Sequence, residues 1–316
     1  MNTNTDMSKY VEECAVLLKE QYKYHRCMYH LNDSNNTKAA IIIEPRKHDL
    51  LIETINNVMS YLGLSWNIHV ITHKDNNSWL GEHLETNINV INITSHSLNS
   101  DEYNKLILSE EFWNQFKEEH ILLFQTDSCI MNSNVNIHSF LHHPFIGGYY
   151  FYSSLEPNKK DEVVSGYVSP IFTDYTNVIH IHNSQSVAFS INGGFSLRQR
   201  SKMLECIRNV TVSDIIAHRN KHNMNNTYYE KCVVGEDTFF QNALDILGYQ
   251  LPTKEECASF CENLCCTPED FNENALGVHN TNKVNEMGRN GYNVIQRLSE
   301  TFNLFLPVAS AAHTHK

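Results

Sequence analysis

The side chains that could do chemistry stand just after apolar runs of the sequence. Ile121-Leu-Leu-Phe-Gln125 predicts a short buried strand, and Asp127 follows it past a polar turn. Because ligands of open α/β sheets bind beyond the carboxyl ends of the strands, we expect the Asp127 carboxylate to lie at a ligand. A carboxylate in that place can bind Mg²⁺ or Mn²⁺, which prefer oxygen ligands. The alternative is that Asp127 only caps the following turn.

Three further polar segments could converge with Asp127 on one cleft, and together they suggest a nucleotide-sugar site. They are Asn192-Gly-Gly-Phe-Ser-Leu-Arg198, Gly235-Glu236-Asp237 and Gly277-Val-His279. Glu236 and Asp237 open an amphipathic helix, where acidic residues are favoured by the helix dipole whatever their function. The functional alternative is that Asp237 accepts a proton from an acceptor hydroxyl, because the rigid start of a helix can position a general base.

Glycines and cations near these segments leave more than one interpretation open. Gly193 and Gly194 allow the backbone to approach another chain segment or a sugar ring, or they form a tight hairpin that breaks the extended pattern. Arg198 and Arg200 could pair with phosphate, or they are solvated residues of a helix.

Three other polar residues are candidates for the same site. His279 could be a further metal ligand, although a chain with 18 histidines places most of them in the core or on the surface. Glu44 and Arg46, at the end of the first strand, are placed to reach a nucleotide base, ribose or diphosphate. Alternatively, Glu44 and Arg46 form only a surface ion pair.

Alternating strand and helix patterns must position these residues, and they predict an α/β fold. We expect strands over residues 38–44, 66–72, 88–93 and 121–125, helices over 48–62 and 100–117, extended segments over 145–152 and 179–191, and helices over 198–209 and 236–247. The alternation predicts a mostly parallel sheet flanked by helices. A helix over 10–29 and a polar linker over 32–37 form an extension, residues 1–37, before a single domain over 38–316.

Composition excludes several classes of protein. The chain of 316 residues has 41% hydrophobic and 19% charged residues, which is typical of a soluble globular protein. Its formal charge of −12 argues against a nucleic-acid partner. No apolar stretch reaches the length of a membrane span, and the polar start lacks the features of a secretory signal, so we expect a cytosolic protein. The nine cysteines are then expected to be reduced.

Four of these cysteines could be read as a metal site or as packing residues. Cys257, Cys261, Cys265 and Cys266 follow a helical spacing that places the first three on one face. The segment lacks the paired C-x-x-C elements of zinc sites, so packed thiols are the favoured interpretation.

Read in order, these motifs resemble a family of uncharacterised glycosyltransferase-like domains found in large DNA viruses and some microbes. The matching segments are Ile42-Ile-Glu-Pro-Arg46, Trp66-Asn-Ile-His-Val70, Phe124-Gln-Thr-Asp-Ser-Cys-Ile130, Phe145-Ile-Gly147, Asn192-Gly-Gly-Phe-Ser-Leu-Arg198, Glu236-Asp-Thr-Phe-Phe240 and Gly277-Val-His279. They cover most of the chain after residue 38. The segment over 149–179 is longer than expected for the family.

The resemblance implies a GT-A-like fold, in which a Rossmann-type nucleotide-binding half is joined to a mixed acceptor-binding half. By similarity, Asp127 is the aspartate of the metal and diphosphate motif, Asp237 is the catalytic carboxylate, and His279 is a late metal ligand for Mn²⁺ or Mg²⁺. The residues expected at the nucleotide-sugar are Glu44, Arg46, Thr126, Asp127, Ser128, Asn192, Gly193 and Gly194. The usual Asp-x-Asp is Asp127-Ser128-Cys129 here, so the metal shell has one carboxylate fewer.

The predicted function is therefore that of an inverting glycosyltransferase. A sugar would move from a nucleoside diphosphate donor, with UDP-sugars expected, to a hydroxyl of a glycan, protein or small molecule. Asp237 would deprotonate the acceptor and Glu236 would position Asp237 or sugar hydroxyls. Two alternatives remain: a sugar-phosphate nucleotidyltransferase, and a non-catalytic glycan-binding or scaffold protein. A viral member of the family would act in the host cytoplasm or the virion.

Overall fold

The computed structural model describes residues 35–84, 88–151, 189–221, 235–263, 272 and 274–281. The helix expected over 10–29, most of the long segment over 149–179, and Cys265 and Cys266 lie outside these residues. Within the described ranges, no helix is both long and apolar enough to cross a membrane.

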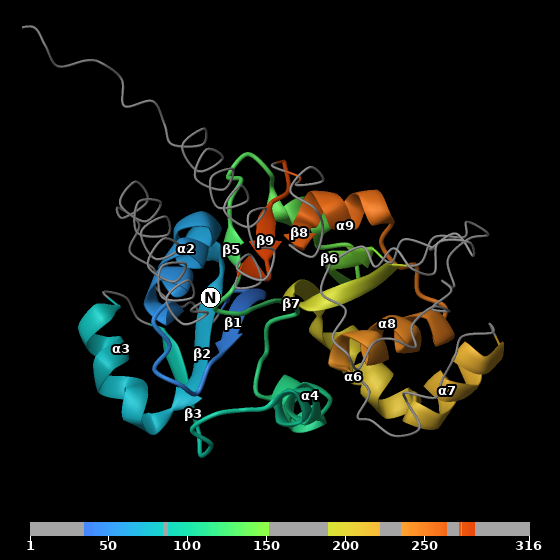
Figure 1. Cartoon of the computed structure of the whole chain (residues 1–316), viewed down its shortest axis with the longest axis horizontal. Helices are drawn as coiled ribbons and strands as arrows, with labels where there is room; N and C mark the ends of the chain where they lie inside the picture. The colour runs from blue at the N-terminus through green and yellow to red at the C-terminus, as the bar shows by residue number, and fades with distance from the viewer. Residues whose placement is uncertain are drawn as a thin grey trace, which may run out of the picture.

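A six-stranded sheet forms the centre of the fold (Figure 1). Its strands are β1 (Lys38–Ile43), β2 (Asn67–His73), β3 (Asn89–Ile93), β4 (His120–Phe124), β6 (Phe145–Phe151) and β7 (Phe189–Gln199). They lie in the order β3-β2-β1-β4-β7-β6, with β1 to β4 mutually parallel and β7 antiparallel to both of its neighbours. The predicted α/β fold with a mostly parallel sheet is confirmed.

The central strands are buried because layers cover both faces of the sheet. Every residue of β2 is buried, including its polar residues. Ala39 to Ile42 of β1 are also buried and form a continuous apolar run, which is typical of doubly covered parallel strands. Helices fill the crossovers between parallel strands. The helix predicted over 48–62 is α2 (Leu51–Leu62), which buries Leu51, Ile55 and Val58.

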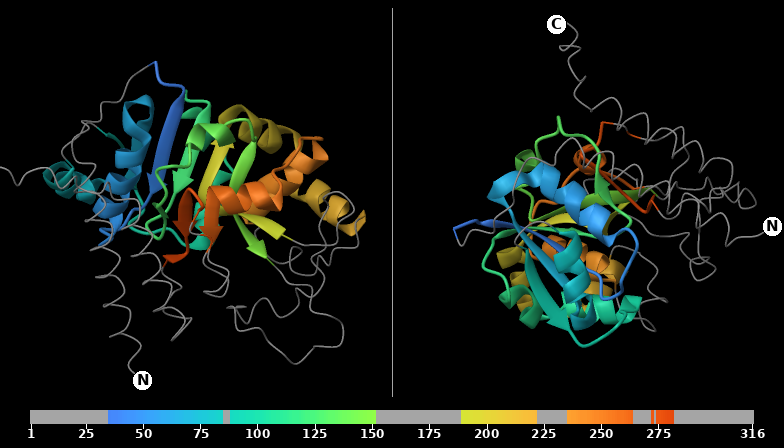
Figure 2. Two further views of the ribbon diagram at one scale, coloured as in Figure 1. Left: turned by 90° about the horizontal axis from the view of Figure 1, so that it is seen from above. Right: turned by 90° about the vertical axis from the view of Figure 1, so that its left-hand side faces the viewer.

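One face of the sheet carries α2, α9 and a second, smaller sheet, and the other carries α4 to α8 (Figures 1 and 2). The small sheet has the order β5-β9-β8, in which β9 is antiparallel to β5 and parallel to β8. The remaining elements are α3 (Asn77–His83), α4 (Ser100–Ile107), α5 (Glu110–Asn114), α6 (Arg200–Asn209), α7 (Val212–Lys221), α8 (Glu236–Ile246), α9 (Lys254–Phe260), β5 (Cys129–Ile130), β8 (Cys261–Asn263), β9 (Gly277–His279) and 3-10 helices at Gly63–Ser65, Lys74–Asn76 and Ile137–Phe140.

Three predictions about local structure were wrong. Gly193 and Gly194 do not break the extended pattern or form a hairpin, because β7 continues through them. The helix expected from Arg198 begins at Arg200, so Arg198 is a strand residue. Cys261 lies in β8 rather than on a helical face with Cys257. The four cysteines of the described residues are buried free thiols.

Arg198 and Glu236 form a buried ion pair that joins β7 to the first turn of α8. The Arg198 side chain has no exposed surface, and its two terminal nitrogens donate to the two Glu236 carboxylate oxygens at 2.5 and 3.0 Å. Its Nε donates to Ser196 Oγ at 2.9 Å, and the guanidinium packs over the rings of Phe145 and Phe240. Arg198 is therefore unavailable to a phosphate, contrary to one interpretation of the sequence.

This pair yields a stability prediction. Glu236→Gln leaves the Arg198 guanidinium buried without a counter-charge, so we expect the free energy of unfolding to fall by about 3–5 kcal/mol. Urea denaturation followed by circular dichroism measures the loss.

The matched control is Glu110→Gln, because Glu110 also lies in the first turn of a helix and pairs with an arginine, Arg208, but in an exposed pair. Its loss should be at most about 1 kcal/mol. Replacing both buried partners, Arg198→Met with Glu236→Leu, should recover most of the stability. Similar losses for the two glutamates would contradict a structural role of the buried pair.

Candidate active site

The loops that follow β1 and β4 leave the same edge of the sheet side by side. Ile42 of β1 pairs with Phe124 of β4, so the segments carrying Glu44 and Thr126 begin next to each other. Thr54 Oγ1 of α2 donates to the Thr126 carbonyl oxygen at 3.3 Å, which ties the second loop to the helix. Burial lowers the pKa of His48, and the Glu44 and Asp127 carboxylates oppose that shift. Carboxylates from both loops thus act on one imidazole.

Glu44 and Arg46 form a bidentate ion pair at the end of β1. The buried Glu44 carboxylate accepts from Arg46 Nε at 2.8 Å and from Arg46 Nη2 at 2.7 Å. The Arg46 side chain is 60% exposed. Glu44 therefore holds the arginine at the sheet edge, and the guanidinium still reaches solvent there.

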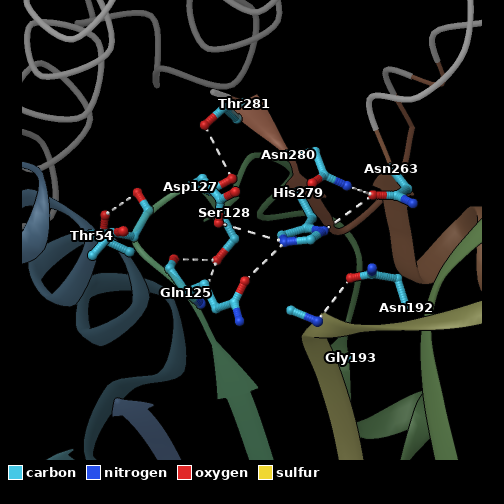
Figure 3. A network of polar contacts seen from close by, with 12 residues as sticks. Thr54, Gln125, Asp127, Ser128, Asn192, Gly193, Asn263, His279, Asn280 and Thr281 are labelled. Carbon is cyan, nitrogen blue, oxygen red and sulfur yellow. Dashed lines mark hydrogen bonds and ion pairs between the residues drawn. The ribbon is translucent and has the colours of Figure 1, made fainter. Parts of the chain in front are cut away.

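Asp127 and His279 meet at this edge (Figure 3). His279 Nε2 lies 3.5 Å from Asp127 Oδ1, and the two side chains are 4% and 16% exposed. The backbone N–H and the hydroxyl of Thr281 both donate to the Asp127 carbonyl oxygen, each at 3.1 Å. The strand end after β4 is thereby fixed to the end of β9, and the two predicted metal ligands come together.

Asn263 contacts the other ring nitrogen of His279. The Asn263 amide nitrogen donates to the Tyr149 carbonyl oxygen at 3.5 Å, and its Oδ1 accepts from the Asn280 amide. That oxygen lies 3.1 Å from His279 Nδ1, and His279 Nε2 lies 3.3 Å from Gln125 Oε1 as well as 3.5 Å from Asp127 Oδ1.

With its proton on Nδ1, His279 would present the Nε2 lone pair beside the Asp127 carboxylate, where one cation could bind both side chains. A histidine whose second nitrogen is held by an outer partner is typical of metal sites. Two ligand atoms 3.5 Å apart can bind one ion, because ligands at about 2.1 Å from a metal lie about 3 Å from each other. The pair fits a divalent cation.

Gly193 and Gly194 connect this pair to the start of α8. A Cβ on Gly194 would overlap with His279 Nε2 and lie 2.8 Å from Gln125 Oε1. A Cβ on Gly193 would overlap with the Glu236 carboxylate, and the Gly193 N–H donates to Asp237 Oδ2 at 3.4 Å. Two consecutive residues of β7 therefore lie against His279 on one side and against the two α8 carboxylates on the other. The sequence suggested that these glycines allow a close approach to another chain segment or to a sugar ring. The described residues show the approach to other chain segments.

Glu236 and Asp237 are neighbours in very different surroundings. Burial and the nearby Glu236 charge raise the pKa of Asp237 to about 6, although the Thr238 and Gly193 N–H groups favour its ionised form. Asp237 Oδ1 accepts from the Thr238 N–H at 2.7 Å, so it also serves the start of the helix. Glu236 is held by Arg198. Neighbouring carboxylates with divergent environments are a feature of acid and base sites.

Several residues of the site were missed from the sequence. Gln125 and Thr281 lie within two residues of predicted ligands and could have been found as neighbours. Asn263 had no such signal, because β8 was not predicted and its partner His279 is distant in the chain. The roles predicted for Glu44, Arg46, Thr126, Ser128 and Asn192 at a nucleotide-sugar remain predictions.

Most of the site, although not Glu44, Arg46 or Thr281, falls within a region that matches a protein family. Residues 87–279, more than half of the chain, match the family described as "Protein of unknown function (DUF5672)", and the chain belongs to this family. A comparison with curated proteins finds no significant match.

The mixed α/β fold resembles several solved structures at low sequence identity. The 4-diphosphocytidyl-2C-methyl-D-erythritol synthase from Anaerococcus prevotii is 12% identical, with 69% of this chain and 88% of that chain covered and a TM-score of 0.34. The mannosyltransferase PcManGT from Pyrobaculum calidifontis, in complex with GDP-Man and Mn²⁺, is 8% identical, with 79% and 65% covered and a TM-score of 0.37. The apo glycosyltransferase GlyE from Streptococcus pneumoniae is 14% identical, with 85% and 63% covered and a TM-score of 0.41. The chain spans less than two thirds of either glycosyltransferase.

The close packing at Gly194 makes a prediction about the site. Gly194→Ala forces the new methyl group against His279, so we expect the free energy of unfolding to fall by about 1–3 kcal/mol. Gly81→Ala is the matched control, because a Cβ there meets nothing within 4 Å on helix α3. That change should raise stability by about 0.4–1 kcal/mol. If both changes stabilise in urea denaturation, the described approach of β7 to His279 is wrong.

Proposed function

We propose that this member of the DUF5672 family is a glycosyltransferase that uses a nucleoside diphosphate sugar and a divalent cation. The observation that carries the proposal is the meeting of Asp127 with His279 beside a glycine pair that also contacts Asp237. A candidate metal site and a candidate base thereby occupy one edge of the sheet, where α/β proteins bind nucleotides.

Donor binding is assigned to the loops after β1 and β4. Arg46, held by Glu44, would pair with a phosphate or reach the nucleoside, and Thr126 and Ser128 would line the same donor. Asp127 and His279 would hold Mn²⁺ or Mg²⁺, which would offset the charge that grows on the departing diphosphate. The chain offers this ion one carboxylate at the motif, because the position of a second aspartate is the buried Cys129.

Acid and base chemistry is assigned to Asp237. With a pKa of about 6 it is mostly ionised at neutral pH, and its conjugate acid is weak enough for it to accept a proton. In the proposed single displacement, the acceptor hydroxyl attacks the anomeric carbon, its proton passes to Asp237, and the bond to the diphosphate breaks with inversion. Glu236, bound to Arg198, would position Asp237 through the first turn of α8. Asn192, Gly193 and Gly194 would lie against the sugar.

The donor and the acceptor follow from the sequence resemblance. A UDP-sugar is the expected donor, and a hydroxyl of a glycan, protein or small molecule is the expected acceptor. We also propose a reducing, cytosolic setting, which suits the free thiols of the described cysteines. A viral or microbial source is a further prediction of that resemblance.

Donor binding provides the first test. In a thermal-shift screen of UDP-sugars and GDP-sugars, we expect at least one donor to raise the melting temperature, and to do so more with Mn²⁺ than with EDTA. Asp127→Asn and His279→Gln should remove the Mn²⁺-dependent part, because each takes away one of the two ligands. Asp101→Asn, at an exposed aspartate of α4 outside the site, is the control.

The outcomes of this screen separate the candidate functions. Release of UDP or GDP from the bound donor supports a transferase. Pyrophosphate release from a nucleoside triphosphate and a sugar phosphate would indicate a nucleotidyltransferase instead. A protein that binds none of the donors, with or without Mn²⁺, would be a glycan-binding or scaffold protein.

The role of Asp237 gives a second test. Asp237→Asn should abolish sugar transfer or donor hydrolysis while donor binding stays nearly unchanged, since the base acts only in the chemical step. In the wild type, the rate should fall as the pH drops through about 6, where Asp237 becomes protonated. Asp101→Asn, at an exposed aspartate in the first turn of α4, should retain full activity.

Stability measurements on the same variant distinguish a lost base from a lost fold. The pKa of Asp237 is raised in the folded protein, so its ionisation disfavours folding, and this penalty develops as the pH rises from about 4 through about 6. Asp237→Asn lacks the penalty. Its melting temperature relative to the wild type should therefore be higher at about pH 7.5 than at about pH 4.5. Full activity in Asp237→Asn would remove this residue from the mechanism.

A further inference from the structure

Three potential metal ligands gather at the opposite edge of the sheet from Asp127. They are His142 and His143, in the segment before β6, and Glu256, in the first turn of α9. Phe145 at the start of β6 pairs with Arg198 near the end of β7, and Gln199 pairs with the first residue of β4. The cluster therefore lies near the edge where β4 begins, whereas Asp127 follows the end of β4. It is separate from the candidate active site.

The His143 side chain is buried with one ring nitrogen unsatisfied. Its side chain is 7% exposed, and its Nε2 has no hydrogen-bond partner among the described residues. This atom points at Glu256, with 3.6 Å between Nε2 and Oε1, which is too long for a hydrogen bond. A buried polar atom without a hydrogen-bond partner needs a water, a ligand or an ion to satisfy it.

Glu256 and His142 complete a set of ligands around this nitrogen. Glu256 Oε2 accepts from the Thr253 N–H at 2.7 Å in a capping box, so the carboxylate is held in place and its other oxygen faces His143. The exposed ring of His142 lies 3.9 Å from that of His143, centroid to centroid. The three candidate ligand atoms lie within 4.8 Å of one another.

We propose that His142, His143 and Glu256 bind a Zn²⁺ ion. Two imidazole nitrogens and one carboxylate oxygen form a ligand set that suits Zn²⁺, with a fourth position for water. Neutral imidazole is the form that binds a metal. The ion would give His143 Nε2 the partner that it lacks.

The ion would fasten α9 to the segment before β6. Glu256 lies at the start of α9, and the chain continues from the end of this helix into β8, where Asn263 holds His279. Zn²⁺ bound at the start of α9 would thus stabilise the segment of α9 and β8, whose far end supports His279 in the candidate active site. The proposal stands on the described cluster alone and does not depend on the proposed transferase activity.

Zinc binding by the full chain tests this proposal. The concentration of free Zn²⁺ is fixed by a chelating buffer, and bound Zn²⁺ is measured by mass spectrometry of the metal. Each wild-type chain should then hold one more Zn²⁺ ion than a chain of Glu256→Gln or His142→Ala. Loss of one ligand should weaken this site more than about tenfold. Zn²⁺ should also raise the melting temperature of the wild type more than that of either variant.

Matched variants separate this site from other histidines and carboxylates. Glutamine preserves the capping box, so Glu256→Gln should melt at the wild-type temperature in EDTA. Glu255→Gln, at the exposed neighbouring carboxylate of α9, and His83→Ala, at an exposed histidine of α3, should bind as the wild type does. His96→Ala disables a second potential metal-binding group, formed by His73, Asp75 and His96. Introduced into both proteins, it should leave the difference in Zn²⁺ content between the wild type and Glu256→Gln unchanged. Equal Zn²⁺ content in the wild type, Glu256→Gln and His142→Ala would overturn the proposal.

Discussion

The candidate active site depends on one strand passing between two polar groups with no side chain in the way. At Gly193 and Gly194, β7 lies against the Glu236 carboxylate and against the His279 ring, and a methyl group at either position would overlap with one of them. Glycine is normally unfavourable inside a strand, because it loses more conformational entropy and packs less surface. Two consecutive glycines here are explained by the close approach, which brings residues from β7, β9 and α8 into contact.

The buried ion pair gives this approach a fixed geometry. Arg198 lies on β7 a few residues after the glycines, and Glu236 lies next to Asp237, so the pair sets the position of α8 relative to the strand. An ion pair in the core contributes little net stability, because desolvation of the charges offsets their attraction. Its value here is positional. Burial and the neighbouring Glu236 charge raise the pKa of Asp237, and the Arg198 charge opposes that shift.

The sequence predicted the elements whose pattern is local and missed those that depend on distant partners. The central strands β1 and β4 are largely continuous apolar runs, and burial on both faces favours that pattern. The pair Gly193 and Gly194 suggested a break, because local propensity takes no account of the carboxylate and ring that exclude side chains there. Asn263 was not foreseen, since its importance comes from His279 alone. The closeness of Asp127 and His279 was expected from the polar segments predicted to converge on one cleft, and from the family resemblance.

Two arrangements at this edge suit ligand binding and chemistry. His279 Nε2 lies beside the Asp127 carboxylate, and Asn263 contacts the other nitrogen of the ring. The pKa of Asp237 is raised by burial and by the neighbouring Glu236 charge, and the Arg198 charge opposes that shift. A cation could bind between His279 and Asp127, and Asp237 could take up a proton from a substrate. Their shared location beside the same two glycines is therefore itself an argument for ligand binding and chemistry at this edge.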